Sequence, residues 1–120
     1  KDHKRMAFIA GGETVVHLTG TGKGGRNQEL ALAAASGIAG LTGTAVFSIG
    51  SDGTDGPTQA AGGFCDWHTK EKLEEQGVDI YETLRNNDAY HALQKCDGLI
   101  VTGATGTNVN DVAVLLLSGE

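Results

Sequence analysis

The glycine-rich stretch Gly20–Glu29 has the residue types and the spacing best suited to holding an anion. Four of its first six residues are glycines, and Lys23 and Arg26 add two full positive charges. Glycines let the backbone present several N–H groups at once, and a helix start adds free amides and the positive end of the helix dipole. The stretch therefore predicts an anion site, with phosphate as the expected guest. A surface turn with two solvated cations is the alternative.

A second loop, residues 50–58, is rich in Asp, Gly and Thr. It places Asp52 and Asp55 beside glycines, directly after the apolar run Thr44–Ile49. If that run is a strand of an open α/β sheet, its carboxyl end is where ligands bind. Mg²⁺ binds in such places through one or two carboxylates together with phosphate oxygens. The same residue types also make good turns, so a magnesium site and a plain turn both stay open.

A third loop, residues 102–111, is dense in hydroxyl and amide side chains. It reads Thr-Gly-Ala-Thr-Gly-Thr-Asn-Val-Asn-Asp. Side chains of this kind can hydrogen-bond a phosphate or a sugar-like polyol. The alternative is a long polar hairpin without a ligand.

Two nucleotide-binding motifs can be tested against these loops. The pattern Gly20-x-Gly22-x-x-Gly25 fits the dinucleotide fingerprint, but the acidic residue expected about 20 residues later is missing, because Asp52 lies too far along. The Walker A motif is absent, because Lys23 is followed by glycine rather than Ser or Thr. The sequence therefore favours another kind of anion site over an NAD site.

Composition narrows the class of protein. The chain has 120 residues, which suits a single domain with a real core. Its net charge of -6 argues against nucleic acid as a partner, and no apolar run approaches the ~20 residues of a membrane span. Cys65 and Cys96 are the only cysteines. We expect them to be buried thiols in a reducing, cytoplasmic compartment, and we expect no signal peptide.

Strand-like and helix-like runs alternate along the chain, which predicts a layered α/β domain with helices packed on a mostly buried sheet. The expected strands are Met6–Ala10, Thr14–Thr19, Thr44–Ile49, Ala60–Asp66, Asp97–Val101 and Val112–Leu117. The expected helices are Arg26–Ala39, Thr69–Gln76, Asp79–Leu84 and Asp88–Lys95.

The arrangement of the sheet follows from the links between these runs. The link between Met6–Ala10 and Thr14–Thr19 is too short for a crossover, so these two strands should pair antiparallel. Together with the helical connections elsewhere, this predicts a mixed sheet. We also expect the three loops to converge on one face, because their polar groups have no local structural need.

Five motifs in order give the sequence a family resemblance. They are Gly11-Gly12-Glu13-Thr14, the run from Gly24 to Leu32, the run from Ser51 to Thr58, Asn86-Asn87-Asp88-Ala89-Tyr90, and the run from Thr102 to Asp111. Together they resemble the MOFRL domain, the carboxyl-terminal domain of class II glycerate 2-kinases, which are often labelled hydroxypyruvate reductases. The resemblance runs from about Ala10 to Leu117. It departs at Ala104, where the family pattern has a proline, and this change removes no polar group.

The resemblance implies one domain, residues 1–120 with a charged leader at 1–5, cut from the carboxyl end of a larger two-domain enzyme. The site would lie in the cleft between this domain and an amino-terminal domain that carries an essential lysine. The implied reaction is transfer of the γ-phosphoryl of ATP, with Mg²⁺, to the 2-hydroxyl of D-glycerate. The isolated domain would then be inactive, with nucleotide, D-glycerate and the amino-terminal domain as its partners.

The resemblance also implies roles for single residues. Arg26 would clamp the transferring phosphate or the glycerate carboxylate, because its planar fork suits both anions. Asp52 and Asp55 would hold Mg²⁺ or orient the hydroxyl. The other expected phosphate- or substrate-binding residues are Gly22, Lys23, Gly24, Gly25, Asn27, Glu29, Thr105, Gly106, Thr107 and Asn108.

Two functions of other classes stay open at this point. One is an NAD(P)H-dependent hydroxypyruvate reductase, against which the incomplete fingerprint and the two cations of the first loop stand. The other is a non-catalytic ligand-binding module. Release of ADP, or a change in cofactor absorbance, would separate the first two readings in a full-length protein.

Overall fold

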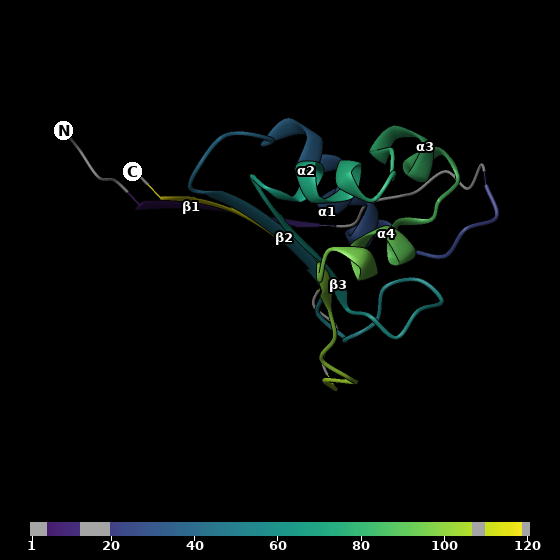
Figure 1. Ribbon diagram of the computed structural model, residues 1–120. Helices are drawn as coiled ribbons and strands as arrows, with labels where there is room; N and C mark the ends of the chain where they lie inside the picture. The colour runs from purple at the N-terminus through teal and green to yellow at the C-terminus, as the bar shows by residue number, and fades with distance from the viewer. Residues whose placement is uncertain (1–4, 13–19, 107–109, 119–120) are drawn as a thin grey trace.

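The computed structural model describes residues 5–12, 20–106 and 110–118, and it has the layered α/β architecture expected from the sequence. Helices pack on a β-sheet, as Figure 1 shows. In chain order the described elements are β1 (Arg5–Gly12), α1 (Arg26–Gly37), β2 (Thr44–Gly50), β3 (Gly62–Asp66), α2 (Thr69–Glu75), α3 (Ile80–Arg85), α4 (Ala89–Lys95), β4 (Leu99–Ile100) and β5 (Asp111–Ser118).

The sheet is antiparallel in each pair of described strands, so the prediction of a mixed sheet is wrong. Its strand order is β1-β5-β2-β3-β4, and β5 runs antiparallel to both of its neighbours. β1 and β2 therefore point the same way, as a strand–helix–strand crossover requires. The last strand inserts between them, so β1 and β2 do not pair with each other and each pairs antiparallel with β5.

The expected pairing of Met6–Ala10 with Thr14–Thr19 stays a prediction, because the second run lies outside the described residues. Where the partner of β1 is described, it is β5, with Arg5 opposite Ser118 and Gly12 opposite Asp111. β1 begins at Arg5, one residue inside the expected charged leader.

The described helices cover one face of the sheet (Figure 1). Along β2, buried and half-buried residues alternate, and Val46 and Ser48 point toward the helices. The other face is apolar but less covered, because Phe64 and Leu116 on it remain 37% and 40% exposed. The sheet is therefore buried mainly on its helical side.

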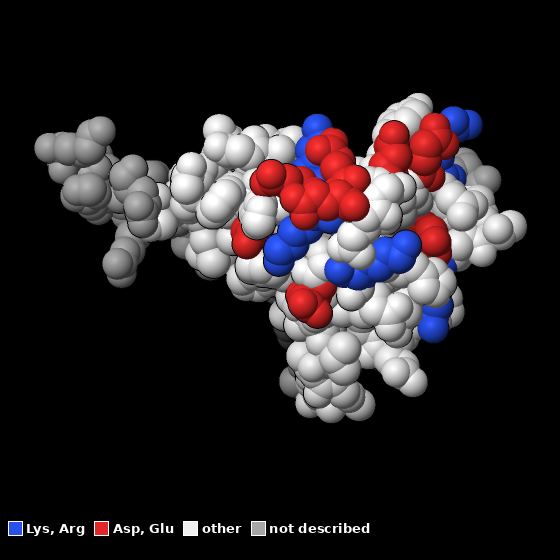
Figure 2. Space-filling model, viewed as in Figure 1, with Lys and Arg blue, Asp and Glu red and all other residues white. Residues whose placement is uncertain are grey.

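Charged side chains of both signs lie close together on the outer surface. Figure 2 shows Asp and Glu gathered over α2 and α3, with Lys and Arg beside them. Lys70 lies 3.9 Å from Glu74, and Arg85 lies 3.8 Å from Glu82. Exposed pairs of this kind contribute little stability.

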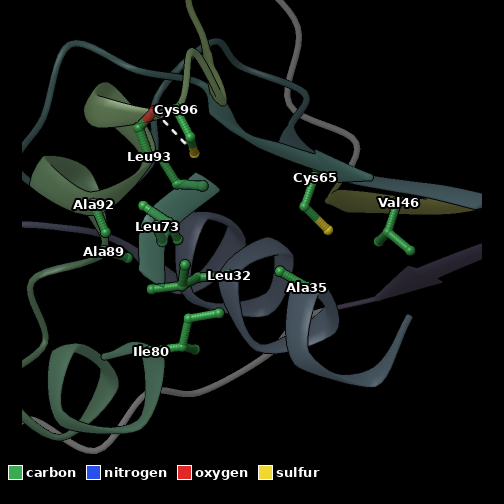
Figure 3. Close-up of a cluster of buried hydrophobic side chains, with 10 residues drawn as sticks. All are labelled: Leu32, Ala35, Val46, Cys65, Leu73, Ile80, Ala89, Ala92, Leu93 and Cys96. Atoms are coloured by element: carbon green, nitrogen blue, oxygen red, sulfur yellow. Dashed lines mark hydrogen bonds between the residues drawn. The ribbon is translucent and has the colours of Figure 1, made fainter. Parts of the chain in front are cut away.

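The core lies between the sheet and the helices, with α1 at its centre (Figure 3). Its buried members are Leu32, Ala35, Val46, Cys65, Leu73, Ile80, Ala89, Ala92, Leu93 and Cys96. Both cysteines are free buried thiols, as expected, and burial raises the pKa of Cys65 to about 12. A thiol with that pKa stays protonated and unreactive at neutral pH.

Close packing against β3 depends on a glycine. A Cβ at Gly63 would lie 2.6 Å from Leu93 Cδ1 and 3.1 Å from the Cβ of Ala31. A larger residue here would push the Leu93 side chain and α1 away from β3, so glycine permits this close packing.

Truncating the core should cost far more stability than truncating the open face. Leu93 is fully buried, so Leu93→Ala should lower the free energy of unfolding by about 2–5 kcal/mol. Leu116→Ala, on the less covered face, is the matched control and should cost clearly less. Urea unfolding of the two variants measures the difference, and equal losses would contradict the assignment of the core.

Candidate functional site

The three loops meet at the end of the sheet opposite the chain termini (Figure 1). They are named here the glycine loop (residues 20–25), the aspartate loop (residues 51–61) and the threonine loop (residues 101–106 and 110). The Thr105 hydroxyl donates to the Ser51 carbonyl at 2.6 Å, and the Thr105 N–H donates to the Asp52 carbonyl at 3.3 Å. The aspartate and threonine loops are thus in direct contact.

The glycine loop packs against the aspartate loop just as closely. A Cβ at Gly25 would lie 2.5 Å from Asp55 Cγ, and a Cβ at Gly56 would lie 2.3 Å from the Gly24 carbonyl oxygen. Gly56 also has a φ of +64°, a conformation that favours glycine. The expectation that the three loops converge is therefore confirmed for their described residues.

The backbone amides of the glycine loop hold a segment of the protein itself. Their partner is the turn between α3 and α4, named here the polar turn (residues 86–88). The hydrogen bonds run from Gly20 N–H to Asn87 Oδ1 (2.9 Å), Thr21 N–H to Asn86 Oδ1 (3.1 Å), Gly22 N–H to the Asn86 carbonyl (2.8 Å) and Lys23 N–H to Asp88 Oδ1 (3.0 Å). Of the amides expected to cradle phosphate, those of Gly22 and Lys23 are thus engaged with the polar turn.

Two glycines of this loop are required by that contact. A Cβ at Gly20 would lie 2.3 Å from Asn86 Cα, and a Cβ at Gly22 would lie 2.4 Å from Asp88 Cβ. Close approach of two backbones, rather than approach of a ligand, therefore accounts for glycine at these positions.

Electrostatics strengthens the contact between the glycine loop and α4. Partial burial acts to raise the pKa of Asp88, but hydrogen bonds from the Lys23 N–H and the His91 ring hold it below its ordinary value. The Lys23 ammonium lies 4.4 Å from the centre of the Tyr90 ring, and the Tyr90 N–H donates to the Lys23 carbonyl at 2.9 Å. Both ends of Lys23 are thus anchored to the start of α4.

The anion at the start of α1 is the carboxylate of Asp55. Its oxygens accept the backbone N–H groups of Asn27 at 3.0 Å and Gln28 at 2.8 Å. They also accept the side-chain amides of the same two residues, at 3.1 Å and 2.9 Å. Asp55 is only 1% exposed, so it fills the anion position that the helix start offers.

Asn27, Gln28 and Glu29 extend this hydrogen-bond network to other parts of the domain. Asn27 Oδ1 accepts the Ser48 hydroxyl of β2 at 2.6 Å, and Gln28 Nε2 donates to Thr58 Oγ1 at 3.0 Å. Glu29 Oε2 accepts the side-chain amide of Asn87 at 2.8 Å. The first turn of α1 therefore ties together β2, the aspartate loop and the polar turn.

The Arg26 side chain does not join the Asp55 network and contacts the start of β5 instead. Its Nη2 donates to Asp111 Oδ1 at 3.0 Å, and its Nε donates to Asp111 Oδ2, so the contact is bidentate. The Arg26 side chain is 41% exposed, whereas that of Asp111 is 8% exposed. A cation at a helix start is opposed by the dipole, and the carboxylates of Asp55 and Asp111 offset that cost.

Asp52 differs from Asp55 in its surroundings. Its carboxylate is exposed and accepts the Thr54 N–H at 3.0 Å and the Thr54 hydroxyl at 2.9 Å. These two hydrogen bonds lower the pKa of Asp52, and the charge of Arg26 lowers it further. Among the described residues, no group of three or more His, Cys, Asp or Glu side chains could hold a metal ion.

The structure brings most of the expected site residues to one place. The glycine loop, the start of α1, both aspartates of the second loop and Thr105 lie in contact, and Gly106 follows with a φ of +79°. Thr107 and Asn108 lie outside the described residues. Their binding roles, and those of the other site residues, stay predictions.

Sequence reasoning missed Asp111 and the polar turn as parts of this site. Asp111 is an acidic residue at the first position of an otherwise apolar strand, and that position was its signal. The polar turn was predicted as part of a family motif but not as a partner of the glycine loop, because Glu29 and the glycine loop lie at least 58 residues from it in sequence.

Comparison with known proteins gives this arrangement a family. The model of the MOFRL family matches residues 6–111. The chain belongs to the MOFRL family. It is 55% identical over 114 residues to the D-glycerate 2-kinase of Thermotoga maritima, covering 95% of this chain and 27% of that protein. It is 45% identical over 116 residues to the glycerate 2-kinase of Pyrococcus horikoshii, covering 96% and 26%.

Solved structures agree with the MOFRL assignment. The crystal structure of the Thermotoga maritima glycerate kinase matches with a TM-score of 0.90 and 56% identity, over 92% of this chain and 27% of that one. The MOFRL domain thus matches the carboxyl-terminal part of glycerate 2-kinases and spans about a quarter of their length.

In the described part of the chain, no helix is long and apolar enough to cross a membrane.

Removing the buried carboxylate should destabilise this MOFRL domain. Asp55→Ala leaves two backbone N–H groups at the start of α1 without their acceptor. At about 1–3 kcal/mol for each buried unsatisfied group, the loss should reach about 3 kcal/mol or more. Asp52→Ala, whose carboxylate is exposed, is the matched control and should cost much less. Denaturant unfolding tests this, and a stable Asp55→Ala domain would contradict the capping role.

The contact between the glycine loop and the polar turn should weaken in acid. Because the pKa of Asp88 is lower in the folded chain, its ionised form adds stability that is complete above the ordinary value of about 3.9 and is lost as the pH falls through the lowered value. The NMR shift of the Lys23 amide should titrate with a midpoint below about 3.9. Asp88→Asn should abolish that step, and a midpoint above the ordinary value would contradict the contact.

Proposed function

We propose that this chain is the carboxyl-terminal domain of a glycerate 2-kinase and supplies anion-binding residues for the ATP-dependent phosphorylation of D-glycerate at its 2-hydroxyl. The family membership and the names of its relatives support the reaction. The observation that carries the proposal is the convergence of the three loops near Arg26, whose guanidinium is held in place by Asp111 at the start of β5.

In the proposed reaction, Arg26 is the catalytic residue of this domain. Phosphoryl transfer needs little covalent help from a protein and depends on positioning and on neutralising charge. A planar guanidinium can hold a phosphate or a carboxylate through two parallel hydrogen bonds. The Arg26 side chain is 41% exposed, and we propose that a substrate would approach it from the side of the loops.

The remaining loop residues take supporting roles. The Lys23 side chain contributes a second positive charge, whereas the amides of Gly22 and Lys23 hold the polar turn. The Thr105 hydroxyl donates to the Ser51 carbonyl and so orders the threonine loop. We propose that Gly106, Thr107 and Asn108 contact the nucleotide or glycerate. Gly24, Gly25, Asn27 and Glu29, which were expected to bind phosphate or substrate, would act by shaping the loop beside Arg26.

The two aspartates fit a magnesium ion unequally. Both oxygens of Asp55 accept N–H donors and are buried, an arrangement that does not suit a metal ligand. Asp52 is exposed and ionised, so it would be the residue that holds Mg²⁺ carried by ATP. When bound, such an ion neutralises charge on the phosphates. We propose that Asp55 serves instead as the cap of α1.

A site at these loops would be completed by another part of a longer protein. Two hollows on the described surface, both lined by Lys70 and Glu74 of α2, contain none of the loop residues. The relatives named as kinases are about four times as long as the matched region. We propose that the other part of the parent protein closes over the loops and that the isolated domain has no turnover.

Replacing Arg26 should abolish most of the kinase activity of the full-length parent. Arg26→Ala should lower kcat by about 100-fold or more, because it removes charge stabilisation from the transition state. Arg26→Lys keeps the charge but loses the fork, so it should fall between Arg26→Ala and the parent. Lys23→Ala should act more weakly and mainly on KM. ADP release with D-glycerate as acceptor measures these changes.

Arg85→Ala, at an exposed position of α3, is the control and should leave turnover unchanged. Near-normal turnover in a folded Arg26→Ala enzyme would remove Arg26 from the reaction. If the full-length parent does not phosphorylate glycerate but oxidises NAD(P)H in the presence of hydroxypyruvate, the protein is a reductase instead.

A further inference from the structure

We infer that Asp111 is a positioning residue, which holds the guanidinium of Arg26 in the orientation needed for phosphoryl transfer. This inference rests on the proposed function, because it gives Arg26 a role in the reaction. Nothing in the sequence motifs assigned a role to Asp111.

The contact has the geometry of a positioning pair. Nε and Nη2 lie along one edge of the guanidinium, and each donates to a different oxygen of Asp111. Two parallel hydrogen bonds fix both the place and the plane of the group, which a single hydrogen bond does not. Beside this contact the Arg26 side chain remains 41% exposed.

The strands next to Asp111 leave room for this contact. In the sheet, Asp111 lies between Gly12 of β1 and Gly50 of β2, and neither neighbour has a side chain. The residue before it, Asn110, has a φ of +79°, an uncommon conformation that asparagine tolerates. The chain therefore turns sharply into β5 and places a carboxylate, itself 8% exposed, beneath the start of α1.

Fixing Arg26 matters because its side chain is long and flexible. An unrestrained arginine loses much of its rotamer freedom when a ligand orders it. Held by Asp111 in advance, the guanidinium meets the developing negative charge without that reorganisation. The pair also reduces the net charge at the site, so an anion would be selected by the shape of the fork more than by charge alone.

The test uses the full-length parent enzyme and the substitution Asp111→Asn, which keeps the size of the side chain. We expect kcat to fall by about 10- to 100-fold, with a smaller change in KM, because a misplaced catalytic group costs rate of that order. Asp111→Asn in the Arg26→Ala background should then add almost nothing. If the fold-loss of kcat in the double variant equals the product of the two single fold-losses, Asp111 acts separately from Arg26 and the inference is overturned.

Chemical rescue gives a readout that a merely structural role would not move. Low, non-denaturing concentrations of guanidinium chloride should restore part of the activity of Arg26→Ala, because free guanidinium can bind the Asp111 carboxylate. The same salt should not rescue the Arg26→Ala, Asp111→Asn double variant. Sodium chloride at equal ionic strength is the control. Equal rescue of both variants would overturn the inference even if Asp111→Asn alone folds poorly.

The outcomes separate this inference from the proposed function. Near-normal turnover of Arg26→Ala would refute the catalytic role of Arg26 and, with it, both proposals. If Arg26→Ala loses most of its kcat while Asp111→Asn keeps a normal kcat, the kinase proposal stands and only the positioning role of Asp111 is refuted.

Discussion

The hydrogen bonds between the Asp55 carboxylate and the first amides of α1 are the constraint on which the rest of the site depends. They join a buried charge in the aspartate loop to the start of the central helix. A buried carboxylate is stable only when its oxygens are fully hydrogen-bonded, so the loop and the helix start must meet in one geometry. That geometry presents Arg26 on the adjacent side of the helix, where Asp111 receives it.

The local elements could be predicted because their signals are local. Apolar runs between glycine-rich turns placed β2 and β5 to within one residue at each end. The strand order could not be predicted, because nothing in the run from Val112 to Leu117 indicates that it inserts between β1 and β2. The expectation of a mixed sheet failed because β5 separates β1 from β2 and because β3 pairs antiparallel with both β2 and β4.

The candidate site was predictable in place but not in detail. A strand, a glycine loop and a helix with two cations do predict an anion position, and the structure has one at the start of α1. The anion there is Asp55, 28 residues from Asn27 in sequence, and no pattern marks such a partner. The glycines of the loop likewise serve contacts with Asn86 and Asp88, which only the folded chain brings near. Chemistry-bearing residue types thus identify a region, whereas the pairing within it depends on tertiary contacts.

The central claim is that Arg26, positioned by its bidentate contact with Asp111, binds the phosphate or carboxylate that takes part in the reaction. A crystal structure of the full-length parent with a non-hydrolysable ATP analogue and D-glycerate tests it most directly. The account predicts an N–H of Arg26 within about 2.7–3.2 Å of a phosphate or carboxylate oxygen, with the bidentate contact to Asp111 retained. A ligand bound elsewhere, with Arg26 contacting only Asp111 and solvent, would contradict it.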